Sequence, residues 1–206
     1  MNALEMCLSQ NDADPSAYAR MMEYAELLLR HNRGTNLIGP LSRDQVVEEL
    51  LVDSILPALA IAPKGPLLDV GSGAGLPGIP LAIFSPETQV HLVEPRQKRS
   101  TFLRIATRRL SLDNVHIHHC RVEDFDALEA GSVATAAAKA FRSPSDWMRE
   151  ADRWLGPCGR LYLFLSHTSW TAEAMALADQ MGFEQEGRRD HPKIKERFGL
   201  VLRRSG

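Results

Sequence analysis

The chain has 206 residues, of which 44% are hydrophobic and 24% are charged, and its formal net charge is −2. This length suits one α/β domain with a small helical addition, and the composition is that of a soluble globular protein. The sequence has no run of about 18 apolar residues, and its N-terminus carries acids without a basic segment. We therefore expect neither a membrane span nor a signal peptide.

The cysteines and histidines give no sign of a metal centre. Three widely separated cysteines form no CxxC pair, which predicts neither a zinc site nor a disulfide framework. They suit a reducing compartment, so we expect a cytoplasmic protein. His116, His118 and His119 lie on a predicted strand, where alternate side chains point to opposite faces. We expect no metal ion.

Positive charge is concentrated in two segments. Residues 1–62 carry four Lys or Arg against nine acids, whereas residues 94–110 carry six basic residues against one acid. Residues 187–206 carry seven basic residues against two acids. Such clusters in a nearly neutral protein are typical of a nucleic-acid contact surface, but they also occur on solvated helices and tails. Charge alone leaves both interpretations open.

Residues 1–62 have a helical pattern. Asp14 and Pro15 are the expected N-cap and first residue of a helix that ends near residues 32–34. Ser42 and Gln45 have the spacing of a capping box, which predicts a second helix. The sequence therefore predicts a helical N-terminal cap over residues 1–62.

From Pro66 onward, short apolar runs alternate with helical stretches, which predicts a mostly parallel sheet with helices on both faces. The expected strands are residues 67–70, 90–93, 115–119, 133–138, 160–165 and 198–202. We expect residues 63–206 to form the main domain, joined to the cap as one structural unit. Ligands of such sheets bind beyond the carboxyl ends of the strands, where the strand order reverses.

A glycine-rich turn, GSGAGLPG, follows the first of these strands. It lacks the Gly-Lys-Ser/Thr of a phosphate-binding P-loop. It also departs from the dinucleotide fingerprint, because the third glycine position holds Leu76. Glu94 ends the next strand, 23 residues after Gly71, where an acid can accept hydrogen bonds from the ribose of an adenosine. An adenosine-containing ligand is favoured over a merely structural bend.

The segment DVGSGAGLPGIPLA resembles the first motif of class I S-adenosylmethionine-dependent methyltransferases, and in particular the glucose-inhibited division protein B family. Further segments match in the family's order: HNRGTNL, VDSILPA, KRSTFLR, CRVEDF and KAFRS. The resemblance implies a Rossmann-like class I methyltransferase fold with a mostly parallel seven-stranded sheet, and S-adenosyl-L-methionine as cofactor. It implies methyl transfer to N7 of a guanine in 16S ribosomal RNA, with that RNA or the small ribosomal subunit as partner. We expect a monomer.

The resemblance also implies roles for single residues. Asp69 would support the turn, Glu94 would hold the ribose, and Val122 with Glu123 would hold the adenine. Lys139 stands where the family usually has arginine and would act catalytically beside the cofactor and the target base. The implied cofactor-binding residues are Asp69, Gly71, Ser72, Gly73, Leu76, Glu94, Val122, Glu123 and Lys139. The implied RNA-binding residues are Asn36, Lys98, Arg99, Phe141 and Arg142.

Three positions near the expected substrate depart from the family pattern. Glu49-Leu50 replaces an Arg-His pair, Ser166 stands where a lysine is usual, and Lys139 replaces arginine. These changes leave an alternative open, a catalytically degenerate or differently specific relative that acts on another RNA or on a small molecule.

The chemistry of guanine N7 suits a site without a catalytic base. N7 has a lone pair and no proton to remove, so alignment can supply much of the catalysis. The polar clamp of exocyclic-amine enzymes is absent after the fourth strand. Pro157-Cys158 resembles the nucleophile of cytosine-C5 enzymes, but we expect it in a turn between a helix and a strand. Trp147 and Trp154 are expected in the core.

Overall fold

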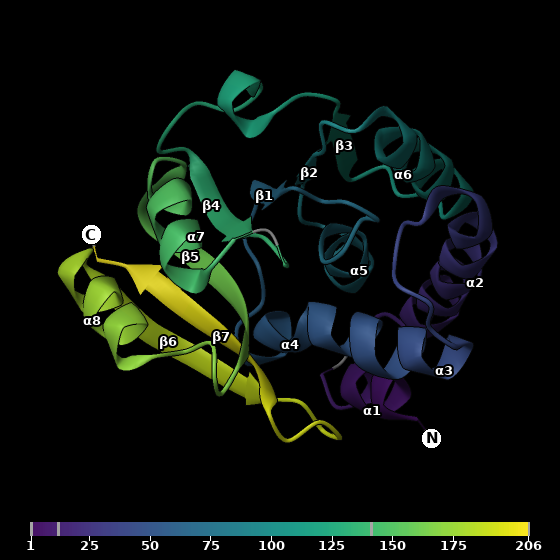
Figure 1. Ribbon diagram of the computed structural model, residues 1–206, viewed down its shortest axis with the longest axis horizontal. Helices are drawn as coiled ribbons and strands as arrows, with labels where there is room; N and C mark the ends of the chain where they lie inside the picture. Colours follow the sequence, from purple (N-terminus) through teal and green to yellow (C-terminus); the bar gives the residue numbers. More distant parts are fainter. Residues whose placement is uncertain (1, 12, 141, 206) are drawn as a thin grey trace.

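The computed structural model describes residues 2–11, 13–140 and 142–205. A seven-stranded sheet in the order β3-β2-β1-β4-β5-β7-β6 forms its centre (Figure 1). Strands β1–β5 are parallel to one another, and β7 is antiparallel to both β5 and β6. The mostly parallel sheet expected from the sequence is confirmed. The strands are β1 (Leu67–Val70), β2 (Val90–Val93), β3 (Val115–His118), β4 (Val133–Ala137), β5 (Leu155–Ser166), β6 (Phe183–Asp190) and β7 (Arg197–Arg204).

Strand β6 is absent from the sequence-based prediction. Its sequence, FEQEGRRD, is mostly charged or polar because it forms an exposed edge of the sheet. The prediction for Pro157-Cys158 was wrong, because β5 already begins at Leu155. These residues form an irregular bulge within the strand, where Cys158 has a φ of 58° and the register with β4 shifts. The local backbone is turn-like, but the chain stays in the sheet.

The N-terminal residues form the predicted helices. The capping box of Ser42 and Gln45 is confirmed, with both reciprocal hydrogen bonds present. The other predicted helix starts later than expected, because Ser16 rather than Asp14 is its N-cap. The helices are α1 (Ala3–Ser9), α2 (Ala17–Thr35), α3 (Arg43–Gln45), a π-helical turn η1 (Val46–Leu51) and α4 (Val52–Ala60).

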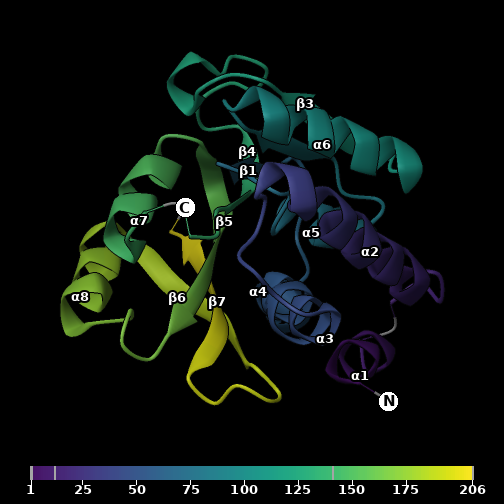
Figure 2. The ribbon, with the colours of Figure 1, turned by 45° about the vertical axis from the view of Figure 1, so that its right-hand side comes forward.

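Helices cover both faces of the sheet, and Figure 2 shows α2 and α4 on one side with α7 and α8 on the other. The four later α-helices are α5 (Gly78–Phe84), α6 (Gln97–Arg109), α7 (Pro144–Asp152) and α8 (Ala172–Gln180). Leu67 belongs to an apolar cluster with α1, α2 and α4–α6, whereas Leu68 belongs to the cluster with α7 and α8. Trp147 and Trp154 are buried in the second cluster, as predicted. No helix among the described residues is long and apolar enough to cross a membrane.

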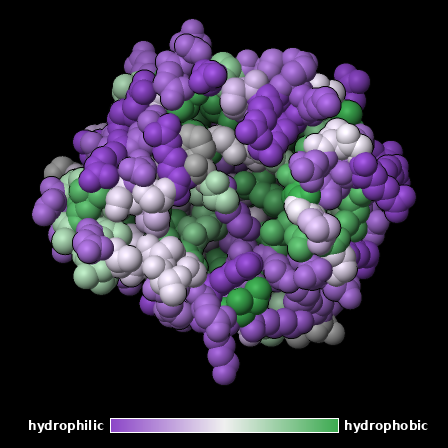
Figure 3. All heavy atoms as spheres, in the orientation of Figure 1, coloured by the Kyte–Doolittle hydropathy of each residue, from purple (hydrophilic) through white to green (hydrophobic). Residues whose placement is uncertain are grey.

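The strand order reverses between β1 and β4, so their carboxyl ends flank the crevice where ligands of such sheets bind. The glycine-rich turn starts at this point, directly after Val70. In the view of Figure 3, this face is hollowed near its centre, and apolar residues are visible there between hydrophilic ones. The fold thus gathers the ends of β1, β2, β4 and β5 at one edge.

Candidate functional site

The turn after β1 has a backbone that favours glycine. Gly71, Gly73 and Gly75 have φ values of 70°, 59° and 93°, in the left-handed region that side chains with a Cβ rarely adopt. The N–H groups of Gly71 and Ser72 both donate to the Val93 carbonyl at the end of β2, at 2.9 and 3.1 Å. The turn is therefore tied to the neighbouring strand.

Asp69 connects the turn to the start of α5. Its side chain is fully buried, and Oδ2 accepts a hydrogen bond from the Gly78 N–H at 3.0 Å. Burial raises the pKa of Asp69 to about 7, although hydrogen bonds from Ser72 and Gly78 oppose the shift. A Cβ on Gly78 would lie 2.2 Å from Leu92 Cδ2, so helix and strand pack closely only because Gly78 has none. Sequence analysis passed over Gly78, because its spacing does not match the dinucleotide pattern.

Glu94 connects the end of β2 to the same turn. It is 2% exposed, Oε2 accepts the Gly73 N–H at 2.8 Å, and Oε1 accepts the Arg96 N–H at 2.8 Å. A carboxylate offers about four acceptor sites, so these two bonds leave capacity for the hydroxyl groups of a ligand. The position suits the ribose contact that the sequence resemblance implies.

Two side chains reach the turn from helices. The Tyr24 hydroxyl on α2 donates to the Ala74 carbonyl at 2.6 Å, and burial raises the pKa of Tyr24 well above its usual value. Tyr24 was not predicted from the sequence, because its place on α2 does not distinguish it from an ordinary core residue. Arg99 on α6 lies over the turn. Its Nη1 is 3.5 Å from the position that a Cβ on Gly73 would occupy. The exposed side chain of Lys98 does not share this position.

A cavity lies on each side of Gly71. One, of about 320 Å³, is lined by the turn, the loop of residues 37–41, Arg99 and Lys139. The other, of about 450 Å³, is lined by Val93, Val122, Glu123 and Arg142, among others. An elongated ligand that crosses the turn at Gly71 would meet apolar side chains, Glu123 and three arginines at one end, and Arg99 with Lys139 at the other. Val93, Val122 and Glu123 suit an adenosine, and the cations Arg99 and Lys139 suit the amino-acid carboxylate of S-adenosylmethionine.

The implied RNA-binding residues are not gathered in one place. Arg142 lines the cavity of Val122, and its Nη2 is 3.9 Å from Glu123 Oε1. Asn36 is exposed at the end of α2, in the left-handed conformation of a C-cap. Phe141 lies outside the described residues.

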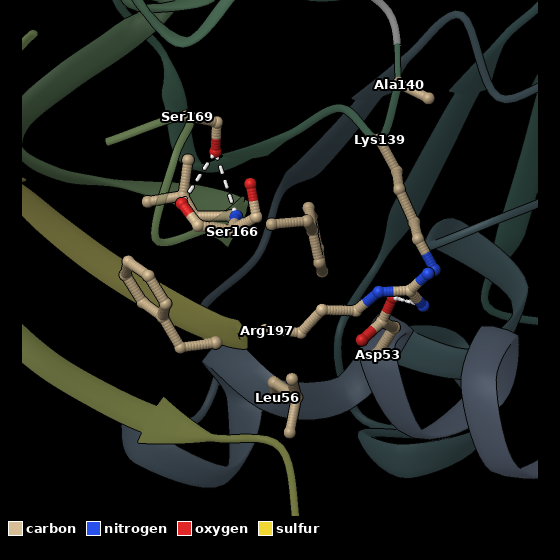
Figure 4. Close-up of a pocket in the computed structure, with 10 residues that line it drawn as sticks. Asp53, Leu56, Lys139, Ala140, Ser166, Ser169 and Arg197 are labelled. Carbon is tan, nitrogen blue, oxygen red and sulfur yellow. Dashed lines mark hydrogen bonds and ion pairs between the residues drawn. The ribbon is translucent and has the colours of Figure 1, made fainter. Parts of the chain in front are cut away.

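A third cavity, of about 260 Å³, begins at Lys139 (Figure 4). Lys139 Nζ lies 3.6 Å from Asp53 Oδ2 and donates to the Leu50 carbonyl at 3.2 Å and to Ser54 Oγ at 3.4 Å. Arg197 Nη1 donates to the same Asp53 oxygen at 3.0 Å. Burial lowers the pKa of Lys139 to about 8, although Asp53 opposes the shift. Lys139 is therefore held by α4 and η1.

The structure brings the positions that depart from the family pattern together around this cavity. The Leu50 carbonyl accepts the Lys139 hydrogen bond, and Glu49 Oε2 lies 3.9 Å from Arg197 Nη2. Ser166 lines the cavity at the end of β5. Sequence analysis missed Asp53 and Arg197, which are 144 positions apart and become neighbours only when β7 packs on α4.

The two basic segments differ in how their charges are paired. Among the described residues of 94–110, only Arg109 forms an ion pair, with Glu23 at 2.9 Å. In residues 187–206, five basic side chains pair with acids, namely Arg188, Lys193, Arg197, Arg203 and Arg204. Helix α6 therefore offers more uncompensated positive charge than the β6–β7 hairpin.

Three relatives have closely similar sequences. A ribosomal RNA small subunit methyltransferase G of Pseudomonas fluorescens is 31% identical over 187 residues, covering 90% of this chain and 85% of the relative. The ribosomal RNA small subunit methyltransferase G of Paracoccus denitrificans is 34% identical over 80% of this chain and 84% of its own length. A ribosomal RNA small subunit methyltransferase G 1 of Syntrophobacter fumaroxidans is 39% identical over 70% of this chain and 68% of its own length.

Solved structures agree on the fold. Aeropyrum pernix fibrillarin, in complex with S-adenosyl-L-methionine, matches 74% of this chain and 73% of its own with a TM-score of 0.56 and 15% identity. The precorrin-6y C5,15-methyltransferase of Geobacter metallireducens matches 82% of this chain and 92% of its own, with a TM-score of 0.55 and 14% identity. The Rossmann-like methyltransferase fold expected from the sequence is confirmed.

The model of the GidB family, described as rRNA small subunit methyltransferase G, matches residues 17–197. This range includes the glycine turn, Glu94, Lys139 and Arg197. The chain belongs to the rRNA small subunit methyltransferase G family.

Proposed function

We propose that this protein transfers a methyl group from S-adenosylmethionine to N7 of a guanine in the 16S RNA of the small ribosomal subunit. Its family is one of S-adenosylmethionine-dependent methyltransferases of small-subunit ribosomal RNA. The observation that supports the choice of N7 is the state of Asp53, the carboxylate that lines the cavity beyond Lys139. Asp53 Oδ2 is held by both Lys139 and Arg197, and Oδ1 is buried out of reach of a substrate, so neither oxygen is placed to remove a proton.

The cofactor would occupy the two cavities beside Gly71. When bound, it supplies a methyl group attached to a positively charged sulfur. Glu94 would accept hydrogen bonds from the ribose hydroxyl groups, and Val122 would contact the adenine. Arg99, whose Nη1 approaches the turn at Gly73, would pair with the carboxylate of the methionine portion.

The target base would approach from the side of Lys139. The cavity of the turn and the cavity beyond Lys139 share Lys139 and Ala140, so a base between them would face the cofactor site. Guanine N7 is an acceptor on the base edge and carries no proton. The protein must then align N7 with the methyl group, and alignment of this kind can lower a barrier by roughly 7–11 kcal/mol.

Methyl transfer to purified small subunits that lack the modification tests this proposal. With labelled S-adenosylmethionine, the label should appear as 7-methylguanosine in a digest of the 16S RNA. The Lys139→Ala variant should lose methyl transfer far more than RNA affinity, whereas Lys139→Arg should remain active because arginine restores a fork of donors. If wild type and both variants bind S-adenosylmethionine but none methylates the subunits, the protein is instead a cofactor-binding relative with another role.

We also propose that the protein acts as a monomer in the cytoplasm, where ribosomal subunits assemble. The described chain supplies both the glycine turn and the neighbouring cavity by itself. Light scattering after gel filtration should give the mass of one chain, 22.9 kDa. A dimer at low micromolar concentration would contradict the monomer.

A further inference from the structure

The cavity beyond Lys139 has the size of a site for one small ring. Its volume of about 260 Å³ is just below the roughly 300–1,000 Å³ of sites for larger small molecules. It lies where β4, β5 and β7 meet α4, and Figure 4 shows Lys139, Asp53 and Arg197 converging on one side of it. Apolar walls come from Leu56, Phe164, Leu165 and Phe198, and polar groups from Asp53, Lys139, Ser166, Ser169 and Arg197.

The charges around this cavity nearly cancel. Asp53 Oδ2 lies between Arg197 Nη1 at 3.0 Å and Lys139 Nζ at 3.6 Å, and Glu49 lies 3.9 Å from Arg197 Nη2. Two cations therefore face two carboxylates. A phosphate group would gain little from such a site, because the acids repel it. An uncharged ring with hydrogen-bonding edges suits the cavity better than an anion does.

Arg197 is the polar group best placed to contact such a ring. Its side chain is 38% exposed, and in the described structure its guanidinium hydrogen-bonds only through Nη1, to Asp53. Asp53 is only 8% exposed, and this bond, with Glu49 3.9 Å from Nη2, restricts the orientation of the planar guanidinium. The remaining N–H groups of the Arg197 guanidinium, which form no hydrogen bond in the described structure, can donate to a ligand.

We infer that the cavity receives the target guanine and that Arg197 donates a hydrogen bond to its O6. O6 and N7 are neighbouring acceptors on one edge of guanine, so a donor on O6 leaves N7 free to receive the methyl group. Adenine carries an amino donor in place of O6, which would face the guanidinium unfavourably. Arg197 is thus a specificity-determining residue, and Asp53 is the positioning residue that orients it. This inference rests on the proposed function.

A substrate analogue tests the contact directly. Small subunits would be reconstituted with 2-aminopurine at the target nucleotide, which keeps N7 but lacks O6, or with inosine, which keeps both but lacks the 2-amino group. Single-turnover methylation by wild type should be about 10- to 100-fold slower on 2-aminopurine than on guanine, because a donor built for O6 loses its partner. Inosine should react within about threefold of guanine.

The Arg197→Ala variant should react slowly with guanine and should discriminate less than about threefold between guanine and 2-aminopurine, because the discriminating donor is gone. Asp53→Asn should lose part of the discrimination while Arg197 is still present. Arg149→Ala is the matched control, since Arg149 is an exposed arginine on α7 that pairs with Asp146 at 3.6 Å. It should keep wild-type rates and discrimination. Circular dichroism of each variant shows whether it is folded.

Two results would overturn the inference. In the first, wild type methylates 2-aminopurine as fast as guanine. In the second, Arg197→Ala keeps the wild-type discrimination between guanine and 2-aminopurine. If the salt slope of RNA binding by this variant is also smaller than that of wild type by about 0.7, Arg197 contacts a phosphate instead. If wild type methylates no guanine-containing subunit, the proposed function fails and the inference fails with it. Transfer to guanine without discrimination refutes the inference alone.

Discussion

The glycine turn and the cavity beyond Lys139 lie next to each other at one edge of the sheet, but they are built differently. The turn is formed by ten consecutive residues, 69–78, with Glu94 and Tyr24 as its main outside supports. The cavity takes Asp53, Lys139, Ser166 and Arg197 from four separate elements or loops. A site built on a local backbone motif can be predicted from the sequence, whereas a site assembled by packing of distant residues cannot.

The residues around the cavity include an arginine despite the departures from the family pattern. Glu49-Leu50 replaces the Arg-His pair usual in the family, yet Arg197 brings a guanidinium to within 3.9 Å of Glu49. The cavity therefore contains an arginine, which β7 supplies.

The largest effect in the comparison of the glycine turn with the cavity is expected on protein stability, at Gly78 in the turn. A Cβ there would lie 2.2 Å from Leu92 Cδ2 and 2.6 Å from Asp69 Oδ2, so Gly78→Ala should destabilise the protein by about 3 kcal/mol. Gly34→Ala on α2 is the control, because nothing lies within 4 Å of its Cβ and alanine should stabilise the helix by about 0.5–1 kcal/mol. Urea unfolding measures both. Equal stability of the two variants would show that α5 can move away from β2 at little cost.

The next largest effect is expected at Glu94. Glu94→Gln cannot accept both the Gly73 and Arg96 N–H bonds as well as ribose hydroxyl groups, so S-adenosylmethionine affinity should fall by about 2 kcal/mol. Calorimetric titration gives this value, with the exposed Glu87→Gln as the control. An affinity within about threefold of wild type would remove Glu94 from the binding site.

A pH-dependent effect is expected at Lys139, in the cavity. Its pKa of about 8 in the folded protein lies below the 10.5 of a free lysine, so between these values the unfolded chain binds the extra proton. The stability of wild type relative to Lys139→Met should therefore rise with pH, by about 1–2 kcal/mol between pH 8 and pH 9.5. Below about pH 7 the difference should be constant, because Lys139 is then protonated in both states. Urea unfolding at a series of pH values tests this, and a flat difference throughout would contradict the lowered pKa.

The smallest effect compares the two basic segments. Lys98 is exposed on α6, so Lys98→Ala should reduce the salt slope of RNA binding by about 0.7, the value for one contact to a single strand. Arg203 on β7 pairs with Glu184 at 3.4 Å, so Arg203→Ala should change the slope less. Filter binding at several salt concentrations measures both slopes. The reverse order would place the RNA along the β6–β7 hairpin.

The sequence by itself determined the features whose signals are local. Apolar runs placed β1 and β2 to the residue, and the Ser42–Gln45 spacing placed a helix start, because these patterns follow from backbone geometry over a few residues. The glycine turn with Glu94 was predicted as the cofactor half of the site for the same reason, and the structure ties Glu94 to the turn. Edge strand β6, with its charged residues, had no such signal.

Only the tertiary structure decided which distant side chains meet. Helix α4 packs so closely on β7 that a Cβ on Gly199 would lie 2.4 Å from the Pro57 nitrogen. This contact brings Arg197 to Asp53, and the pairing of β4 with β5 places Ser166 in the cavity that Lys139 lines. Arg99 and Lys98 are neighbours in the chain, but helix geometry directs Arg99 to the turn and leaves Lys98 exposed. Burial then lowers the pKa of Lys139 to about 8, because desolvation depends on the surrounding protein rather than on neighbours in sequence.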